Sequence, residues 1–233
     1  MKITIITLFP EVFKPLLGSS IIAKAQKEKK IEVNLIDLRN FGLGPRHEVD
    51  DRIYGGGIGM ILRVEPIARA IAKSSAKGGP ASGWKNQSSK IILLTPQGKT
   101  FKQQTAKRLA KEKHLILICG KYEGVDERVR KLVDEEISIG DYVLSGGEVP
   151  AMVVLDAVTR VIPGVLEKEA TEYESFSENL LETPQYTRPE IYGRMKVPKV
   201  LLSGNHQEIE KWRQQEALKK TKKRRPDLLR KLP

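Results

Sequence analysis

The segment SIGDYVLSGGEVP, residues Ser138–Pro150, places two adjacent glycines directly before an apolar run with helical periodicity. That run predicts a helix from Val149 to Val161, with a core face made of Ala151, Val154, Leu155 and Val158. Because glycine has no side chain, Gly146-Gly147 allows another backbone or a flat ligand to approach main-chain amides closely. The same pair can also form a tight turn with no ligand role. The neighbouring segments are needed to choose between a ligand site and a simple turn.

The first half of the chain alternates short β-branched runs with helical patterns, which is typical of an α/β sheet. Residues 115–118 are apolar at every position, and strands buried on both faces are typical of parallel sheets. We therefore expect an α/β fold with a mostly parallel sheet and helices on both of its faces. The expected strands are Ile3–Leu8, Glu32–Asp37, Lys90–Thr95 and His114–Cys119, and the other expected helices are Ser20–Lys29, Val64–Ser74 and Lys102–Lys113.

Two further segments, Asp50–Met60 and Cys119–Arg128, are also rich in glycine and polar residues. The second of them, like Ser138–Pro150, follows an apolar strand-like run, and open α/β sheets bind ligands beyond the carboxyl ends of their strands. The sequence lacks both a GxGxxG motif after the first strand and a GxxxxGK[ST] motif. This argues against a dinucleotide-dependent dehydrogenase and a P-loop NTPase, and it favours a less usual ligand pocket.

Composition limits the cellular setting. The single cysteine, Cys119, excludes an intramolecular disulfide and a cysteine-rich zinc site. No apolar run approaches the ~20 residues needed to span a bilayer. The start of the chain predicts a strand rather than a signal peptide, because no small-residue cleavage site follows it. We expect a cytoplasmic protein.

The net charge of +12 is concentrated near the carboxyl end, where residues 191–233 hold 13 Lys and Arg against four acidic residues. A concentrated positive charge suits a polyanion such as nucleic acid or an anionic membrane face. Ile209, Trp212 and Leu218 recur there with helical spacing, which favours a folded basic module over a loose solubilising tail.

Two connections interrupt the pattern of strands and helices. Ser74–Lys90 is rich in Ser, Gly, Lys and Pro, and Gly164–Ser177 is acidic and irregular. We interpret the latter as an interdomain linker. The expected organisation is therefore an α/β domain of residues 1–163, a linker of residues 164–177 and a basic helical domain of residues 178–233.

Seven motifs along nearly the whole chain carry a specific resemblance. They are TLFPEVF (Thr7–Phe13), DDRIYGGGIGM (Asp50–Met60), LLTPQGK (Leu93–Lys99), CGKYEGVDERV (Cys119–Val129), EISIGDYVLSGGEVPAMVVLDAVTRVIPGV (Glu136–Val165), ESFSENLLETPQYTRPEIY (Glu174–Tyr192) and LLSGNHQEIEKWR (Leu201–Arg213). With these motifs, in this order, the chain resembles bacterial tRNA (guanine-N1)-methyltransferases, which belong to the SPOUT class.

The resemblance implies an α/β domain with a deep trefoil knot in its carboxyl-terminal part, although knots are otherwise almost absent from proteins. It also implies a homodimer with active sites at the subunit interface, and S-adenosylmethionine as the methyl donor. The cofactor contacts carried over by the resemblance are Leu94, Thr95, Pro96, Gly120, Tyr122, Glu123, Ser138, Ile139, Gly140, Tyr142, Leu144, Gly146, Gly147 and Pro150.

The reaction implied by the resemblance is methyl transfer to N1 of the guanine at tRNA position 37, next to the anticodon. N1 bears a proton at neutral pH, and its removal builds negative charge on O6, so a carboxylate base and a cation are needed. The resemblance assigns the cation to Arg160. The family's base is an aspartate before a Ser-Phe pair, and here Glu174 precedes Ser175-Phe176, with Glu172 as the alternative base. A second departure is Lys121, where the family has arginine.

The resemblance assigns tRNA binding to the first glycine-rich segment and to the carboxyl-terminal domain. The expected substrate contacts are Asp50, Tyr54, Gly55, Gly56, Gly57, Gly59, Asn205 and His206. No cluster has metal-ligand spacing, so the family's reported use of Mg²⁺ is the sole ground for expecting that ion. Two alternatives stay open: a catalytically inactive SPOUT-fold RNA-binding protein, and a related SPOUT enzyme that acts on rRNA or on a tRNA ribose.

Overall fold

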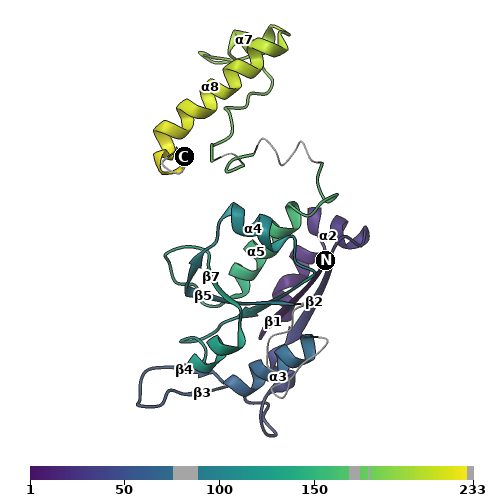
Figure 1. Ribbon diagram of the computed structural model, residues 1–233, viewed down its shortest axis with the longest axis vertical. Coiled ribbons are helices and arrows are strands. Elements are labelled where there is room, and N and C mark those ends of the chain that lie inside the picture. Colours follow the sequence, from purple (N-terminus) through teal and green to yellow (C-terminus); the bar gives the residue numbers. More distant parts are fainter. Residues whose placement is uncertain (76–88, 168–173, 178, 230–233) are drawn as a thin grey trace. The chain divides into compact units, whose positions relative to one another are not determined.

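The computed structural model describes residues 1–75, 89–167, 174–177 and 179–229. The chain divides into two compact units, residues Met1–Leu166 and residues Glu167–Pro233 (Figure 1). The domain boundaries expected at residues 163 and 178 stay predictions. Residues 168–173 of the expected linker, residue 178, and residues 76–88 of the expected Ser74–Lys90 connection lie outside the described part.

The first unit is built on a parallel five-stranded sheet with the order β2-β1-β6-β5-β7. This confirms the expected α/β class, whereas the trefoil knot stays a prediction. The strands of the sheet are β1 (Lys2–Thr7), β2 (Glu32–Asp37), β5 (Lys90–Thr100), β6 (His114–Cys119) and β7 (Glu135–Ser138).

Helices cover both faces of this sheet (Figure 1). Along the fully buried β6, Leu115 and Leu117 contribute to one apolar core, and Ile116 and Ile118 contribute to the other. The first core is closed by η1 (Pro10–Phe13), α1 (Lys14–Leu17), α2 (Ser20–Lys27), α4 (Gln103–Leu109) and α5 (Glu148–Arg160), and the second by η2 (Leu38–Phe41), α3 (Val64–Ser74) and η4 (Glu127–Leu132). The continuous apolar run therefore follows from burial on two sides.

The observed elements differ from the expected ones mainly at their ends. The helix expected from Val149 is α5, whose predicted core residues are at most 1 % exposed. Helix α4 ends at Leu109, earlier than expected. Strand β5 was expected to end at Thr95 but continues to Thr100, with a register shift against β7 between Leu94 and Lys99. The shift makes residues 95–98 bulge out of the ladder at the carboxyl edge of the sheet.

The regular elements of the second unit, within its described residues, are mainly helices. They are the hairpin β8 (Ile191–Tyr192) and β9 (Met195–Lys196), and the helices α7 (Lys199–Leu202), α8 (His206–Arg224) and α9 (Pro226–Leu229). In α8 the buried residues are Ala217 and Thr221, whereas Leu218, which we expected on the packed face, is 39 % exposed. Within the described residues, none of the helices combines the length and the apolar character needed to cross a membrane.

A buried histidine lies at the amino-terminal edge of the sheet. The His114 ring is hydrogen-bonded to two hydroxyls, with Nε2 2.9 Å from Thr4 Oγ1 and Nδ1 2.8 Å from Ser89 Oγ. Burial lowers the pKa of His114, the charge of Lys2 lowers it further, and Glu32 partly opposes the shift. The folded state therefore favours the neutral ring.

Acidification should destabilise the first unit through His114. The lowered pKa means that below about pH 6.5 the unfolded chain takes up this proton first, so the stabilisation is complete above that pH and is lost as pH falls toward the folded-state pKa. Urea denaturation at about pH 7.5 and about pH 5.5 should show a smaller free energy of unfolding at the lower pH. A His114→Gln variant, which cannot titrate, should show a smaller decrease, and equal decreases would contradict this account.

Candidate active site

The loops after β5, β6 and β7 surround one cavity of about 290 Å³ at the carboxyl edge of the sheet. All fourteen residues that the resemblance assigns to the cofactor line this cavity. They come from the β5 bulge (Leu94, Thr95, Pro96), the loop after β6 (Gly120, Tyr122, Glu123), and the segment from β7 to the start of α5 (Ser138, Ile139, Gly140, Tyr142, Leu144, Gly146, Gly147, Pro150). The structure thus brings these residues together, while their cofactor role stays a prediction.

Two of the three loops are in direct backbone contact. The Gly147 N–H donates to the Gly120 carbonyl at 2.8 Å, and Lys121 pairs with Gly146 as an antiparallel bridge. A Cβ on Gly147 would lie 2.6 Å from the Cys119 Cα and 2.8 Å from the Gly120 nitrogen, both of them backbone atoms. Glycine is therefore required at position 147 for the two loops to meet.

A buried carboxylate next to Gly147, that of Glu148, connects this loop contact to the first strand of the sheet. Glu148, at the start of α5, is 8 % exposed, and its Oε1 accepts a hydrogen bond of 2.8 Å from the hydroxyl of Thr7 at the end of β1. Burial raises the pKa of the nearby Cys119 thiol well above its usual range, and the charge of Glu148 raises it further, against a lowering by a Thr7 hydrogen bond. The thiol stays protonated, so Cys119 is unsuited to act as a nucleophile.

The first glycine-rich segment forms a hairpin beside the cavity. Strands β3 (Asp50–Arg52) and β4 (Met60–Leu62) pair antiparallel, and the turn between them exposes 98 % of Tyr54, while Gly55, Gly56 and Gly57 are also exposed. The turn suits contact with a large external partner, because its side chains face solvent rather than a core. The assignment of Asp50 and of this turn to the substrate stays a prediction.

Backbone hydrogen bonds fix this hairpin to the cavity wall. The Glu123 N–H donates to the Met60 carbonyl at 3.1 Å, and the Leu62 N–H donates to the Gly124 carbonyl at 3.0 Å. Gly59 has a φ of +86°, and a Cβ there would lie 2.6 Å from Cγ of Glu123, which itself lines the cavity. The predicted substrate segment and the predicted cofactor cavity therefore share a wall.

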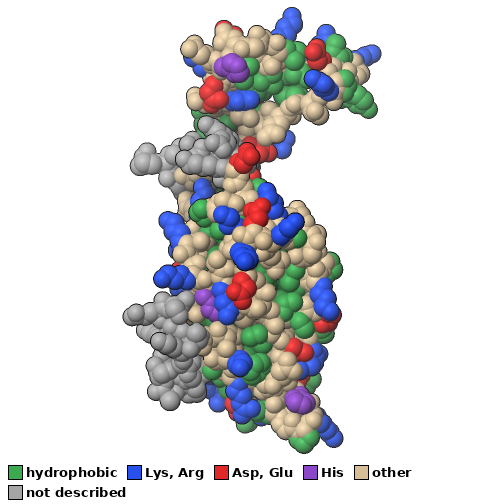
Figure 2. Space-filling model, turned by 90° about the vertical axis from the view of Figure 1, so that its right-hand side faces the viewer, with side chains coloured by type: hydrophobic (Ala, Val, Ile, Leu, Met, Phe, Trp, Pro, Cys, Tyr) green, Lys and Arg blue, Asp and Glu red, His purple; other side chains and the backbone are tan. Residues whose placement is uncertain are grey.

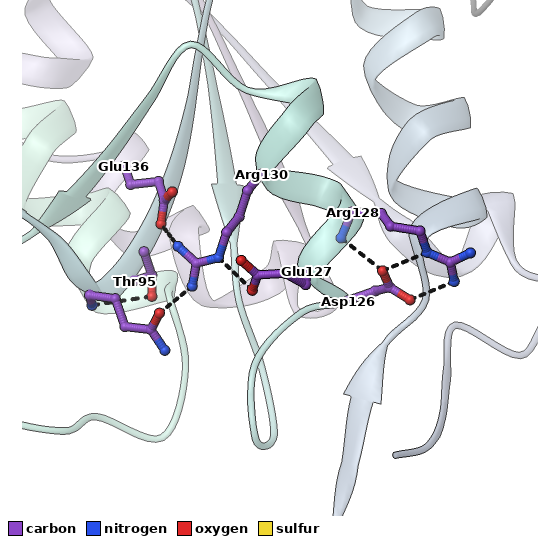
Figure 3. Close-up of polar contacts among 7 residues, drawn as sticks. Thr95, Asp126, Glu127, Arg128, Arg130 and Glu136 are labelled. Atoms are coloured by element: carbon purple, nitrogen blue, oxygen red, sulfur yellow. Dashed lines mark hydrogen bonds and ion pairs between the residues drawn. The ribbon is translucent and has the colours of Figure 1, made fainter. Parts of the chain in front are cut away.

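One arginine ties together three elements at the cavity rim (Figure 3). Arg130 of η4 donates through Nε to Glu127 at 2.8 Å, through Nη1 to Glu136 of β7, and through Nη2 to Gln97 of the β5 bulge. The hydrogen bond to Glu136, then that to Glu127, raises the pKa of Arg130. The cavity is also lined by Gln97, Glu127 and Arg130. The sequence patterns alone did not predict a role for these three residues.

A second ion pair, between Arg128 and Asp126, lies near Arg130 but outside the cavity lining. Arg128 donates to both carboxylate oxygens of Asp126, at 2.9 and 2.7 Å, and these hydrogen bonds are the main cause that lowers the pKa of Asp126. Neither residue lines the cavity. The carboxylate also accepts a hydrogen bond from the Arg128 backbone, so this pair caps the start of η4.

The two expected catalytic residues belong to different units. Arg160 is the last residue of α5 in the first unit, and Glu174 is a half-buried residue of the second. The alternative base, Glu172, lies outside the described residues. Asn205 caps α8 by accepting a hydrogen bond of 3.3 Å from the Glu208 N–H, and His206 begins that helix, with both side chains exposed. Asn205 thus has a structural role beside the predicted one in substrate binding.

Acidic, histidine and cysteine side chains do not gather into a metal site in the part of the chain that the structure describes: no group of three or more is placed to hold an ion. The expectation of Mg²⁺ therefore rests on the resemblance alone.

The fold and the cavity are those of an α/β protein with a candidate ligand site at the carboxyl edge of a parallel sheet. Comparisons with known proteins identify the class. A profile of the family described as tRNA (Guanine-1)-methyltransferase TrmD matches residues 1–231. Proteins named tRNA (guanine-N(1)-)-methyltransferase are similar over almost their full length: 53 % identity for Mycoplasmopsis synoviae (98 % of this chain, 97 % of the relative), 50 % for Ruminiclostridium cellulolyticum (100 % and 98 %) and 50 % for Bacillus subtilis (100 % and 94 %).

The chain belongs to the tRNA (guanine-N1)-methyltransferase family, and it is an enzyme that transfers a methyl group. The family resemblance read from the motifs is thereby confirmed.

On the expectation from the resemblance that the cavity binds S-adenosylmethionine, replacing Arg130 should weaken that binding. In Arg130→Met the β5 bulge loses its tie to β7 and η4, so the dissociation constant for S-adenosylmethionine, measured by titration calorimetry, should rise roughly tenfold, the equivalent of one charge-assisted hydrogen bond. Arg128→Met is the matched control, because it removes an equal charge two residues away and leaves the cavity rim intact; its dissociation constant should stay within about twofold of the wild type. Equal effects of the two variants would show that Arg130 acts only through net charge.

Proposed function

We propose that this protein transfers the methyl group of S-adenosylmethionine to N1 of the guanine at tRNA position 37, in the cytoplasm. The observation that carries the proposal is the convergence of three glycine-rich segments: two build one cavity, and the third forms a hairpin on its wall. The names of the relatives specify a guanine of tRNA and its N1 atom. They favour this reaction over a related activity on rRNA or on a ribose.

The cavity suits S-adenosylmethionine. Its volume of about 290 Å³ is near the lower end of the range usual for small-molecule sites, and its lining combines apolar side chains with bare backbone. Gly120, Gly146 and Gly147 would offer main chain to the ligand, and Leu94, Ile139 and Leu144 would pack against its flat parts. Bound there, the cofactor supplies an electrophilic methyl group that needs positioning more than activation.

One side chain would accept the N1 proton of the guanine, and another would stabilise the negative charge that develops on O6. We assign Glu174 as the base that accepts the N1 proton, since a carboxylate is the group that the reaction requires at that atom. We assign Arg160, at the end of α5, to the negative charge that builds on O6. Glutamate in place of the family's aspartate keeps the carboxylate and lengthens its reach by one methylene.

We propose further that the enzyme is a homodimer whose active sites lie at the subunit interface. The first unit exposes valines on neighbouring elements: Val149 and Val153, one turn apart on α5, are 52 % and 40 % exposed, and Val12 of the adjacent η1 is 42 % exposed. Exposed apolar side chains on neighbouring elements suit contact with another protein surface. A second copy of the chain would cover them.

The basic surface supports binding of a polyanion. Figure 2 shows Lys and Arg side chains on the surface of each unit. On α8, Lys222, Lys223 and Arg224 are exposed and make no hydrogen bond or ion pair with other described residues. Lys219, by contrast, is paired with Glu216, and Arg225 with Asp227. We assign the first three to tRNA phosphates.

The assignment predicts salt-sensitive tRNA binding. Replacing Lys222, Lys223 and Arg224 together by Gln should weaken tRNA binding and reduce the slope of log affinity against log salt by about two to three, close to one unit for each phosphate that is no longer neutralised. Filter binding over a series of NaCl concentrations measures the slope. Affinity for S-adenosylmethionine should not change, and an unchanged slope would remove these residues from the RNA interface.

The base assignment predicts that Glu174→Gln lowers turnover about 10²- to 10⁴-fold, to a small residual rate, because an amide cannot accept the N1 proton. Transfer of labelled methyl to unmodified tRNA measures turnover, and mapping of the modified nucleoside identifies the atom. Binding of S-adenosylmethionine should persist, and Glu174→Asp should retain part of the activity. Glu190→Gln, which changes an exposed carboxylate elsewhere in the second unit, serves as the control with near wild-type turnover.

Two results would count against these assignments. A Glu174→Gln enzyme with near wild-type turnover would move the base elsewhere. A wild-type protein that binds tRNA but transfers no methyl group at any pH would support the inactive RNA-binding alternative.

A further inference from the structure

The segment that carries Glu174 forms a compact turn, which we call the base turn (residues 174–177 and 179–182). Three hydrogen bonds close it: Phe176 N–H to the Leu180 carbonyl at 2.7 Å, Ser177 N–H to the Glu174 carbonyl at 3.1 Å, and Glu182 N–H to the Ser175 hydroxyl at 3.2 Å. The backbone of Glu174 is thus part of a defined local structure.

This turn holds two residues in the left-handed region of backbone conformation, and for one of them, Phe176, that region is unfavourable. Phe176 has a φ of +73° and Asn179 a φ of +59°, although neither is glycine. The Cβ atom makes the left-handed region costly; asparagine tolerates it, whereas a bulky residue such as phenylalanine adopts it rarely. Such a conformation persists only where surrounding contacts fix it, so the base turn depends on what it is attached to.

The attachment is the end of helix α8. The Leu181 N–H donates to Thr221 Oγ1 at 2.9 Å, and the Thr221 hydroxyl donates in turn to the Ala217 carbonyl at 2.7 Å. Thr221 is fully buried, and its single hydroxyl serves both the helix and the turn. Without that hydroxyl, the Leu181 N–H would lose its partner.

Two cations of the same helix end add to this anchor. Lys220 Nζ donates to the Glu182 carbonyl at 2.9 Å, and the Arg225 guanidinium lies 5.7 Å from the centroid of the Phe176 ring, within cation–π range. Arg225 therefore contacts the strained residue itself. The basic helix end thus provides a platform for the base turn.

We propose that Thr221, Lys220 and Arg225 are positioning residues that hold Glu174 for catalysis, an inference that rests on Glu174 being the base. A base contributes only when its carboxylate is held within hydrogen-bond reach of the proton, so anchoring its backbone raises the rate without changing ligand affinity. Lys222, Lys223 and Arg224 lie on the same helix segment and face solvent. Helix α8 therefore joins a phosphate-binding surface rigidly to the segment that bears the base.

The first test compares Thr221→Val with Thr221→Ser in the full-length enzyme. Thr221→Val keeps the shape but leaves the Leu181 N–H unpaired, so kcat should fall about ten- to a hundredfold. The KM values for both substrates should stay within about threefold, because neither binding surface changes. Thr221→Ser restores the hydroxyl and should restore kcat. A loss of kcat that comes with an equal loss of tRNA affinity, or that serine does not repair, would overturn the proposal.

A matched pair of lysines provides a second test that does not disturb the core. Lys220→Met removes the hydrogen bond to Glu182, whereas Lys219→Met removes the same charge from a side chain that is 78 % exposed and paired with Glu216. Both variants should affect tRNA affinity equally and slightly. Only Lys220→Met should lower kcat, by about three- to tenfold, the effect of one hydrogen bond. Equal kcat values for the two variants would overturn the proposal.

A double-mutant cycle separates this inference from the base assignment. If Thr221 acts through Glu174, Thr221→Val should cause no further loss in the residual rate of Glu174→Gln. Losses that multiply would show that Thr221 acts independently, and they would overturn the positioning role even if Glu174 is the base. A Glu174→Gln enzyme at wild-type rate would overturn the base assignment itself.

Discussion

The structure depends on one close backbone contact, the hydrogen bond from Gly147 to the Gly120 carbonyl. A parallel sheet already brings the carboxyl ends of β5, β6 and β7 to one edge, but the loops that follow could still diverge. The contact forces the segments after β6 and β7 to share the walls of one cavity. Glu148, held by Thr7, fixes the same junction to β1 and starts α5 there. The junction that shapes the cavity is therefore made by contacts within the protein itself.

Much of this arrangement could be predicted from local sequence patterns. Helix α5 was placed to within one residue, because its apolar spacing reflects burial of a single face. Strand β6 was predicted with its observed bounds, because a strand buried on both faces is apolar throughout. Two of the glycine-rich segments were predicted to border a ligand pocket because they follow strands, and both line the cavity. The family motifs supplied the chemistry, which composition and periodicity do not contain.

Other features depend on partners that are distant in the sequence. The end of β5 was misplaced because Pro96 and Gly98 resemble a strand terminus, whereas β7 resumes pairing at Lys99. Arg130 looked like one charge in a polar segment, since its partners Gln97 and Glu136 lie on other elements. The role of Thr221 could not be predicted for the same reason. A threonine within a basic helix resembles a surface residue, and only the structure shows its contact with Leu181.

The burial of Cys119 at the end of β6 gives the protein a natural probe of how often this part of the sheet opens. The only thiol of the chain lies at the end of β6, is 2 % exposed, and is held in its protonated form. A thiol-directed reagent can therefore react only in the moments when β6 separates from its neighbours. The rate of that labelling would measure how often the ligand-binding edge of the sheet opens, with no engineered probe and no contribution from any other residue.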